Sequence, residues 1–413
     1  MKRYCFWLVV IFFSLAIGSY ILNLWRGIVL SRESFSKESL LKAIKVNPDN
    51  PDPFHQLGIL HQWNLIQVDL KESEKYFQKA IERNPLEQEY WLNLAKVLQQ
   101  MDERDKSVKA LEKAIQTFPT SYRGRWMAGN LLLQQGSIEK AISHFSFILS
   151  YYPNQSGFVY DVWRKVASDP DFIMERLVPK DPSSFRQYLS YLYDTGDKES
   201  LQKAWQKKDL FGYKADRNDT IRYIEFLIFY GDFNEAFQIW RARLHEEGIP
   251  IPSDGNLITN GGFEEEKILG GGFDWKIERV PGAAISFDHS MTYDGKGSLR
   301  IVFNGKENVD FYHVSQFVPL KPNSEYTLKA HMKTKDVTTK SGLKIEISGV
   351  HSNFYGVSES LNGDNGWKEL TVLLRTPAQA KGGLVRIRRN RTDKFDRFIS
   401  GTVWIDNVRL VEK

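Results

Sequence analysis

Cysteine is almost absent from this chain of 413 residues, which contains only Cys5. One cysteine excludes a disulfide framework within the chain, and it excludes a zinc site ligated by several cysteines. Cys5 lies ahead of an apolar segment and not behind it, so we do not interpret it as a lipoprotein attachment site. The hydrophobic content of 42% and charged content of 26% are ordinary for a globular protein, and the length allows two or three domains.

Catalytic motifs are missing as well. No Gly-rich phosphate loop, Gly-x-Ser-x-Gly elbow or His-Glu-x-x-His motif stands out. The eight histidines are scattered, and those of the C-terminal region lack the spacing of zinc ligands. We therefore expect that the chain is not an enzyme. The net charge of +5 is mild, so we also expect no nucleic acid partner.

The N-terminus carries the longest uncharged run of the chain. Lys2 and Arg3 precede residues 4–25, which as a helix would be about 33 Å long, enough to cross a bilayer. The leading positive charges favour a cytoplasmic N-terminus with the rest of the chain on the other side. Residues 1–28 are thus predicted to be a transmembrane anchor. The alternative is a signal peptide cleaved at the small residues 16–18, which would release a secreted protein.

A repeat of 34 residues follows, marked by Pro85, Pro119 and Pro153. Small or apolar residues precede these prolines by five positions and an aromatic residue or leucine by eight: Ala80, Ala114, Ile148, Phe77, Leu111 and Phe145. Gly58 is three residues further from its proline than Ala95 and Gly129 are from theirs, so the first hairpin contains a three-residue insertion. This period resembles the tetratricopeptide repeat, which implies paired helices that bind protein.

The period weakens after Pro153 but continues. Gly196 and Gly231 are turn glycines 35 residues apart, each between apolar helical patterns. We expect helical repeats across residues 31–247, in which most aromatic side chains pack between helices. Residues 248–255 are rich in Gly and Pro and are predicted to be a linker.

Beyond the linker the pattern changes to short alternating strands separated by Gly, Asn, Asp and Pro. The expected strands are residues 284–288, 298–303, 314–320, 326–334, 343–350, 367–375, 384–389 and 402–410. Such spacing predicts an all-β sandwich or jelly roll over residues 256–413. The whole chain is therefore expected to be multidomain, with a transmembrane helix, an all-α solenoid and an all-β sandwich.

Four segments of this region resemble the carbohydrate-binding modules of the family 4/9 type. These are Asn-Leu-Ile-Thr-Asn-Gly-Gly-Phe-Glu at 256–264, Gly-Lys-Gly-Ser-Leu-Arg-Ile at 295–301, residues 318–328, and Gly-Thr-Val-Trp-Ile-Asp-Asn-Val-Arg-Leu at 401–410. The resemblance implies a galactose-binding-like jelly roll and a glycan ligand. It is more specific for the fold than for the ligand.

The resemblance also implies a structural calcium ion where the two ends of the module meet. Glu264 and Asp406 match the acidic positions, and carbonyl groups near Gly262 and residues 296–298 would complete the six to eight oxygens that calcium needs. Asn407 replaces a second acid that is frequent there, which lowers the ligand charge. The alternative is that both acids are ordinary turn and strand carboxylates.

Sugar binding requires exposed rings surrounded by groups that form hydrogen bonds. The candidates that combine these properties are Trp275, Phe311, Tyr312, His313, Gln316, Asn353 and Tyr355. Strict alternation places Tyr312 and Gln316 on one face of their strand and Phe311 and His313 on the other, without deciding which face is exposed. Trp275 follows a glycine-rich loop and is either an exposed platform or a core residue.

Arginines cluster near the C-terminus. Arg386 and Arg388 alternate with apolar residues, so both can project from one face of a strand. Guanidinium groups bind the carboxylates and sulfates of acidic glycans well. The alternative is a solvated edge strand that uses charge against aggregation.

Together these features predict a non-catalytic envelope scaffold anchored in a bacterial inner membrane, with its bulk in the periplasm. Its helical repeats would bind protein and its sandwich would bind glycan, in the assembly or export of a surface polysaccharide. The alternative is an assembly adaptor of a membrane complex whose β-domain contacts protein and binds no sugar. A structural calcium ion is the only cofactor expected.

Overall fold

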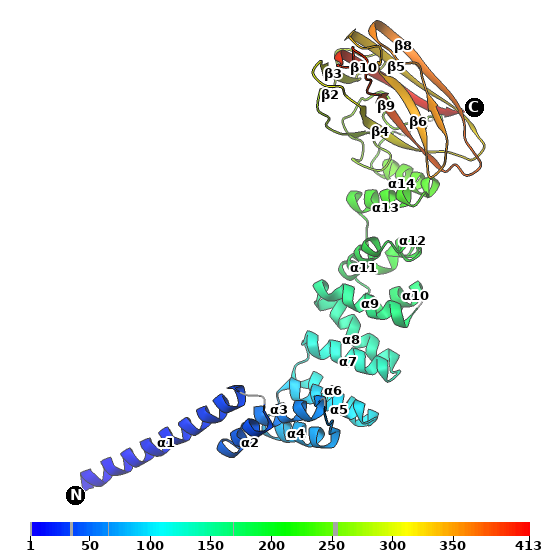
Figure 1. Cartoon of the computed structure of the whole chain (residues 1–413). Helices are drawn as coiled ribbons and strands as arrows, with labels where there is room; N and C mark the ends of the chain where they lie inside the picture. Colours follow the sequence, from blue (N-terminus) through cyan, green and yellow to red (C-terminus); the bar gives the residue numbers. More distant parts are fainter. Residues whose placement is uncertain (1, 34–35, 65, 168, 251–254) are drawn as a thin grey trace. The chain divides into compact units, whose positions relative to one another are not determined.

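The computed structural model describes residues 2–33, 36–64, 66–167, 169–250 and 255–413. The chain divides into two compact units, Met1–Lys214 and Ala215–Lys413. The first contains helices only, and the second combines a helical hairpin with a β-sandwich (Figure 1).

The first helix, α1 (Lys2–Glu33), contains the one segment of the described residues that is long and apolar enough to cross a membrane, Val10–Val29. Its apolar side chains Phe12, Leu15 and Trp25 are exposed. A membrane anchor and a signal sequence share this length and composition, so both alternatives for residues 1–28 stay open.

Helices fill the rest of the first unit. They are α2 (Lys37–Val46), α3 (Asp52–Trp63), α4 (Leu70–Arg83), α5 (Gln88–Gln100), α6 (Arg104–Thr117), α7 (Tyr122–Gln134), α8 (Ile138–Tyr151), α9 (Ser156–Val166), α10 (Pro170–Phe172), α11 (Pro182–Thr195) and α12 (Lys198–Gln206). A π-helical turn, η2 (Ile173–Leu177), follows α10, and 3-10 turns occur at η1 (Pro153–Gln155) and η3 (Lys208–Phe211).

The predicted repeat is confirmed in its packing. Gly58 lies against the ring of Phe77, and Gly129 lies against that of Phe145, so close that a Cβ at either glycine would lie 2.6–2.7 Å from the ring. Each small residue thus allows its helix to approach the next one. The loop between α3 and α4 is three residues longer than the loop between α5 and α6, which locates the insertion.

The second unit begins with the hairpin of α13 (Arg217–Phe229) and α14 (Phe233–Glu246). Its strands are β1 (Lys276–Ile277), β2 (Ala283–Phe287), β3 (Leu299–Asn304), β4 (Phe311–Pro319), β5 (Glu325–Val337), β6 (Lys344–Val350), β7 (Tyr355–Val357), β8 (Gly363–Arg375), β9 (Gly382–Arg389) and β10 (Ser400–Glu412). All eight expected strands are present, and the sequence pattern missed the very short β1 and β7.

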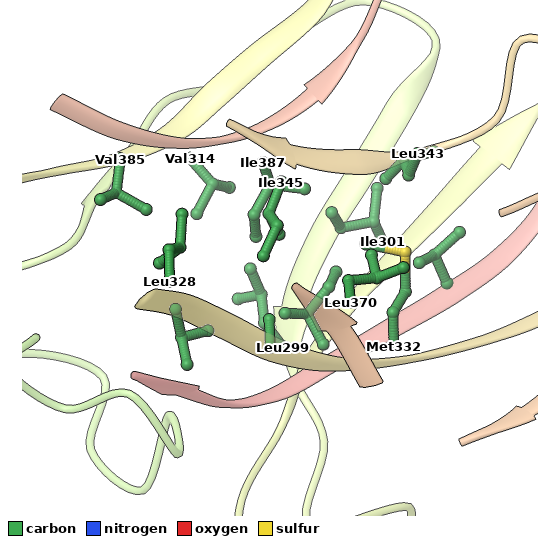
Figure 2. Packing of buried hydrophobic residues seen from close by; sticks show 14 of the residues in the cluster. Leu299, Ile301, Val314, Leu328, Met332, Leu343, Ile345, Leu370, Val385 and Ile387 are labelled. Atoms are coloured by element: carbon green, nitrogen blue, oxygen red, sulfur yellow. The ribbon is translucent and has the colours of Figure 1, made fainter. Parts of the chain in front are cut away.

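The strands form two antiparallel sheets, each of five strands. The β4 sheet has the order β1-β4-β9-β6-β7, and the β5 sheet has the order β2-β3-β10-β5-β8. Between them lies an apolar core that includes Leu299, Leu328 and Met332 from the β5 sheet, with Ile345 and Ile387 from the β4 sheet (Figure 2). The predicted all-β sandwich is confirmed.

The hairpin packs directly onto the sandwich, so the compact division falls at residues 214–215 and not at the expected linker 248–255. A loop of three glycines, residues 270–272, makes this possible: a Cβ on Gly271 would lie 2.5 Å from Ile221 and 2.8 Å from Glu225 of α13. Phe273 then inserts its buried ring beside Phe237, with the ring centres 5.1 Å apart. Within the expected linker, residues 251–254 lie outside the described part of the chain.

Candidate functional site

The outward side chains of β4 are set by a bulge near its start. Phe311 pairs with Arg389 of β9 but Val314 pairs with Ile387, so β4 has one extra residue here. Tyr312 and His313 therefore both project outward, while Phe311 and Val314 point into the core. Simple alternation had separated Tyr312 from His313, and the bulge brings them together.

The predicted arginines lie beside these rings. β9 is the central strand of the β4 sheet, so the edge-strand alternative is wrong. Arg386 Nε lies 2.9 Å and Arg388 Nε 3.8 Å from the carboxylate of Glu346 on neighbouring β6. Arg388 also donates to Asp310. Since each guanidinium already has an acidic neighbour, the cluster is close to neutral.

Aromatic rings border this cluster on both sides. Tyr312 is 46% exposed and stacks on His313 with ring centres 4.4 Å apart. On the other side, Tyr355 of β7 is 58% exposed and donates a hydrogen bond of 2.8 Å to Glu346 Oε2. Burial raises the pKa of the Tyr355 hydroxyl, and the bond to Glu346 raises it further, so this hydroxyl remains a donor.

A shallow cavity of about 370 Å³ opens between the rings; we call it the arginine cavity. Its lining consists of Asp310, Tyr312, Glu346, Tyr355, Arg386, Arg388 and Asn390. His313 stands behind Tyr312, and burial lowers the pKa of its imidazole, which favours the neutral ring. Asn353 is exposed on the turn after β6, outside this lining. The arginine cavity offers flat rings together with donors and acceptors.

Two sequence candidates have structural roles instead. Trp275 is only 8% exposed, stacks on Phe263 and donates from Nε1 to the carbonyl of Asn260. Gln316 is 1% exposed, and its amide forms hydrogen bonds of 2.8 Å with both the N–H and the carbonyl of Thr259. Both residues fasten the segment before β1 to the sandwich, so Trp275 is not an exposed platform and the Gln316 amide is already occupied.

The two acidic residues expected to bind calcium are neighbours in space. Asp406 is fully buried and accepts hydrogen bonds from the backbone N–H groups of Tyr293 and Asp294, while Glu264 accepts from that of Lys296. A Cβ on Gly262 would lie 3.2 Å from Glu264 Oε1 and 3.7 Å from Asp406 Oδ1, so Gly262 leaves a small cradle between the carboxylates.

This donor set fits calcium in ligand type and supplies two of its oxygens. Burial raises the pKa of Asp406, and the charge of Glu264 adds to this, so a cation would relieve the repulsion. Within the described residues, no group of three or more His, Cys, Asp or Glu side chains is placed to hold a metal. Backbone carbonyls would therefore have to supply the remaining ligands.

Glu346 is the functional candidate that the sequence did not reveal. It lies on a strand where it alternates with Ile345 and Ile347, a pattern that identifies an outward position but no partner. Only the pairing of β6 with β9, which places Glu346 opposite Arg386, brings the carboxylate and the arginines together.

Comparison with known proteins agrees with both regions. Residues 255–393 match the family of carbohydrate binding domains, and residues 88–120 match the tetratricopeptide repeat. Over 167 residues the chain is 26% identical to the tRNA(Glu)-specific nuclease WapA of Bacillus subtilis subsp. natto, and it is 24% identical to the tRNA nuclease WapA of Bacillus subtilis. Each match covers 38% of this chain but only 7% of the nuclease.

Among solved structures, a family 16 carbohydrate binding module is 22% identical, with a TM-score of 0.27, and the match covers 38% of this chain and 99% of that one. MamA is 16% identical, with a TM-score of 0.27, and the match covers 42% of this chain and 86% of the MamA chain.

Proposed function

We propose that this chain, in which tetratricopeptide repeats precede a carbohydrate-binding sandwich, is a non-catalytic scaffold that binds glycan on the outer face of the β4 sheet. The observation that carries the proposal is the arginine cavity. There, exposed Tyr312 and Tyr355 border the polar groups of Glu346, Arg386 and Arg388. Sugar rings present apolar faces to aromatic rings and hydroxyl groups to such donors and acceptors.

The ion pairs prepare this face for a ligand. Glu346 is buried and is held by Arg386 on one side and by the Tyr355 hydroxyl on the other, so its orientation is fixed before binding. A preorganised site loses less entropy when it binds. Because Arg386 and Arg388 are balanced by Glu346 and Asp310, we infer a preference for neutral glycans over acidic ones.

The repeats and α1 extend the proposal to the whole chain. Tetratricopeptide repeats imply a protein partner, and we propose that the apolar segment Val10–Val29 serves as a membrane anchor and is not cleaved as a signal sequence. We infer a bacterial envelope protein with its bulk in the periplasm, acting in the assembly or export of a surface polysaccharide. Nuclease activity gains no support from WapA, since the shared part is 7% of those proteins.

The adaptor hypothesis remains the second candidate for one specific reason. The sandwich already packs a helical hairpin against one of its surfaces, with Phe273 beside Phe237 and Trp240. A surface of this kind can bind helices of another protein, in which case the β-domain would contact protein and no sugar.

A glycan array with the purified full-length protein tests the proposal. We expect binding to neutral glycans that Tyr312→Ala and Tyr355→Ala each weaken about tenfold, which corresponds to about 1.4 kcal/mol. Phe395→Ala, which removes a fully exposed ring of the same unit, serves as the matched control and should leave binding unchanged. Absence of binding to neutral and acidic glycans alike would favour the adaptor.

A further inference from the structure

The turn between α13 and α14 covers one end of the outer face of the β4 sheet. Phe233 lies against Phe317 of β4, and its ring is so close to Gly382 of β9 that a Cβ there would lie 2.3 Å away. His351, after β6, donates from Nε2 to the carbonyl of Phe229 at 2.9 Å. Since β4, β9 and β6 are adjacent, the turn crosses three strands and closes the face at this end.

A second cavity, of about 440 Å³, opens where α13 meets the sheet; we call it the hairpin cavity. Two residues of α13 line it: Phe229, which is 71% exposed, and Glu225, whose carboxylate is exposed. From the sandwich it receives Lys276 of β1 with Ser315 and Phe317 of β4. It therefore combines rings with a carboxylate, an ammonium group and a hydroxyl, as a polar ligand with an apolar face requires.

Strand β4 connects the two cavities. Tyr312 lines the arginine cavity, Ser315 and Phe317 line the hairpin cavity, and His313 projects outward between them. Five residues of an extended strand span roughly 17 Å. A glycan of several units can thus lie along β4 and contact both cavities.

We propose that the glycan ends in the hairpin cavity, so that this protein recognises a chain end and not an internal segment. The inference rests on the proposed function, which supplies the glycan. A polymer that lies along β4 cannot continue past the turn at residues 229–233, because Phe233 occupies the surface of Phe317 and Gly382 there. The last hairpin of the helical region is therefore part of the binding site.

The test uses full-length protein and soluble xylan, mixed-linkage β-glucan and galactomannan. Each is offered intact and as a partial digest of equal mass that contains ten times as many chain ends. We expect about tenfold more protein bound per mass of the digest. Equal binding to digest and polymer would overturn the inference and leave the proposed function standing. Absence of binding to these glycans and to every glycan of the array would refute both.

Two variants connect this effect to the cavity. Phe229→Ala and Glu225→Gln should each reduce the gain from chain ends at least threefold, and both positions are exposed, so the fold should survive. Phe395→Ala and Glu359→Gln are the matched exposed controls in the same unit, and they should keep the full gain. If Phe229→Ala and Glu225→Gln retain the full gain while Tyr312→Ala loses binding, the ends are recognised elsewhere and the inference is wrong.

Discussion

The helical unit and the sandwich differ in how far apart in the sequence their contacting residues lie. In the helical unit the same bond recurs from one hairpin to the next: Ser73 donates to the carbonyl of Gly58, and Ser107 donates to that of Ala95. In the sandwich, β10 pairs with β3 and with β5, which are far from it in sequence. A repeated local contact is visible in the period of the sequence, whereas a long-range pairing is not.

The units also differ in the ionisable groups they bury. The helical unit buries His55 and His144, and burial lowers the pKa of each imidazole to about 4. The sandwich buries Asp406, whose pKa burial raises. Acidification should therefore destabilise the helical unit through these histidines and stabilise the sandwich through Asp406.

The largest expected effect is the acid sensitivity of the helical unit. A histidine whose folded pKa is about 4 stabilises the fold above pH 6.5, and this stability is lost as the pH falls to 4. The loss is up to about 3 kcal/mol for each histidine. Urea unfolding of full-length protein between pH 7 and pH 4 should show it.

The double variant His55→Gln/His144→Gln should flatten this pH dependence, and His289→Gln, which replaces an exposed histidine of the sandwich, should not.

In the sandwich, Asp406 has the opposite effect on stability, because a raised carboxyl pKa favours the folded state as the pH falls. Burial also lowers the pKa of His313 and His331, which offsets part of that gain. If acid destabilises the sandwich more than the helical unit, the expected difference between the two is wrong.

The next largest effect should come from replacing glycine with alanine, which should destabilise the two units by different amounts. A Cβ on Gly261 would lie 2.0 Å from the backbone carbonyl oxygen of Val408, whereas the three atoms nearest a Cβ on Gly129 all belong to the ring of Phe145. We expect Gly261→Ala to destabilise the sandwich by about 3 kcal/mol. Gly129→Ala should destabilise the helical unit by only about 1 kcal/mol, since a clash of about 2 kcal/mol with the Phe145 ring is offset by about 1 kcal/mol of helix preference for alanine.

Denaturant unfolding measures both changes. Gly366→Ala and Gly157→Ala are the controls, because a Cβ at either position meets nothing within 4 Å. Equal losses for Gly261→Ala and Gly129→Ala would show that backbone and side-chain neighbours adjust equally well, contrary to our comparison.

The last expected effect concerns calcium, which should stabilise the sandwich alone. At a hundred times its Kd, a ligand of the folded state adds about 2.7 kcal/mol, which for a unit of this size raises Tm by roughly 5–10 °C. Calorimetry with calcium and with a chelator should show this shift in the sandwich transition. Glu264→Gln should abolish it and Glu265→Gln, its exposed neighbour, should not. Identical melting in both conditions would mean that Glu264 and Asp406 are ordinary turn and strand carboxylates.

Much of the fold could be predicted because its signals are local. The proline period locates the hairpins, the small residues at Gly58 and Gly129 identify the close approaches, and alternation identifies eight strands. These features depend on residues within one turn, one strand or one repeat. Only β1 and β7, with two and three residues, were too short to give a pattern.

The site was predictable only in part, because it depends on how strands pair. The sequence located Tyr312, His313, Arg386 and Arg388, but the bulge in β4 decided that both rings face outward. From the sequence, Trp275 could be either an exposed platform or a core residue beside its glycine-rich loop. Its burial follows from the contacts of Phe263 and Asn260, which no local pattern encodes.

By itself, then, the sequence determined an apolar N-terminal helix, a repeat array and a sandwich, since hydrophobic periodicity is a property of consecutive residues. Tertiary structure decided that Glu346 joins the arginines and that the α13–α14 turn closes the outer face of the β4 sheet. The physical reason is that register and packing are fixed by long-range contacts, whose partners are far apart in the chain.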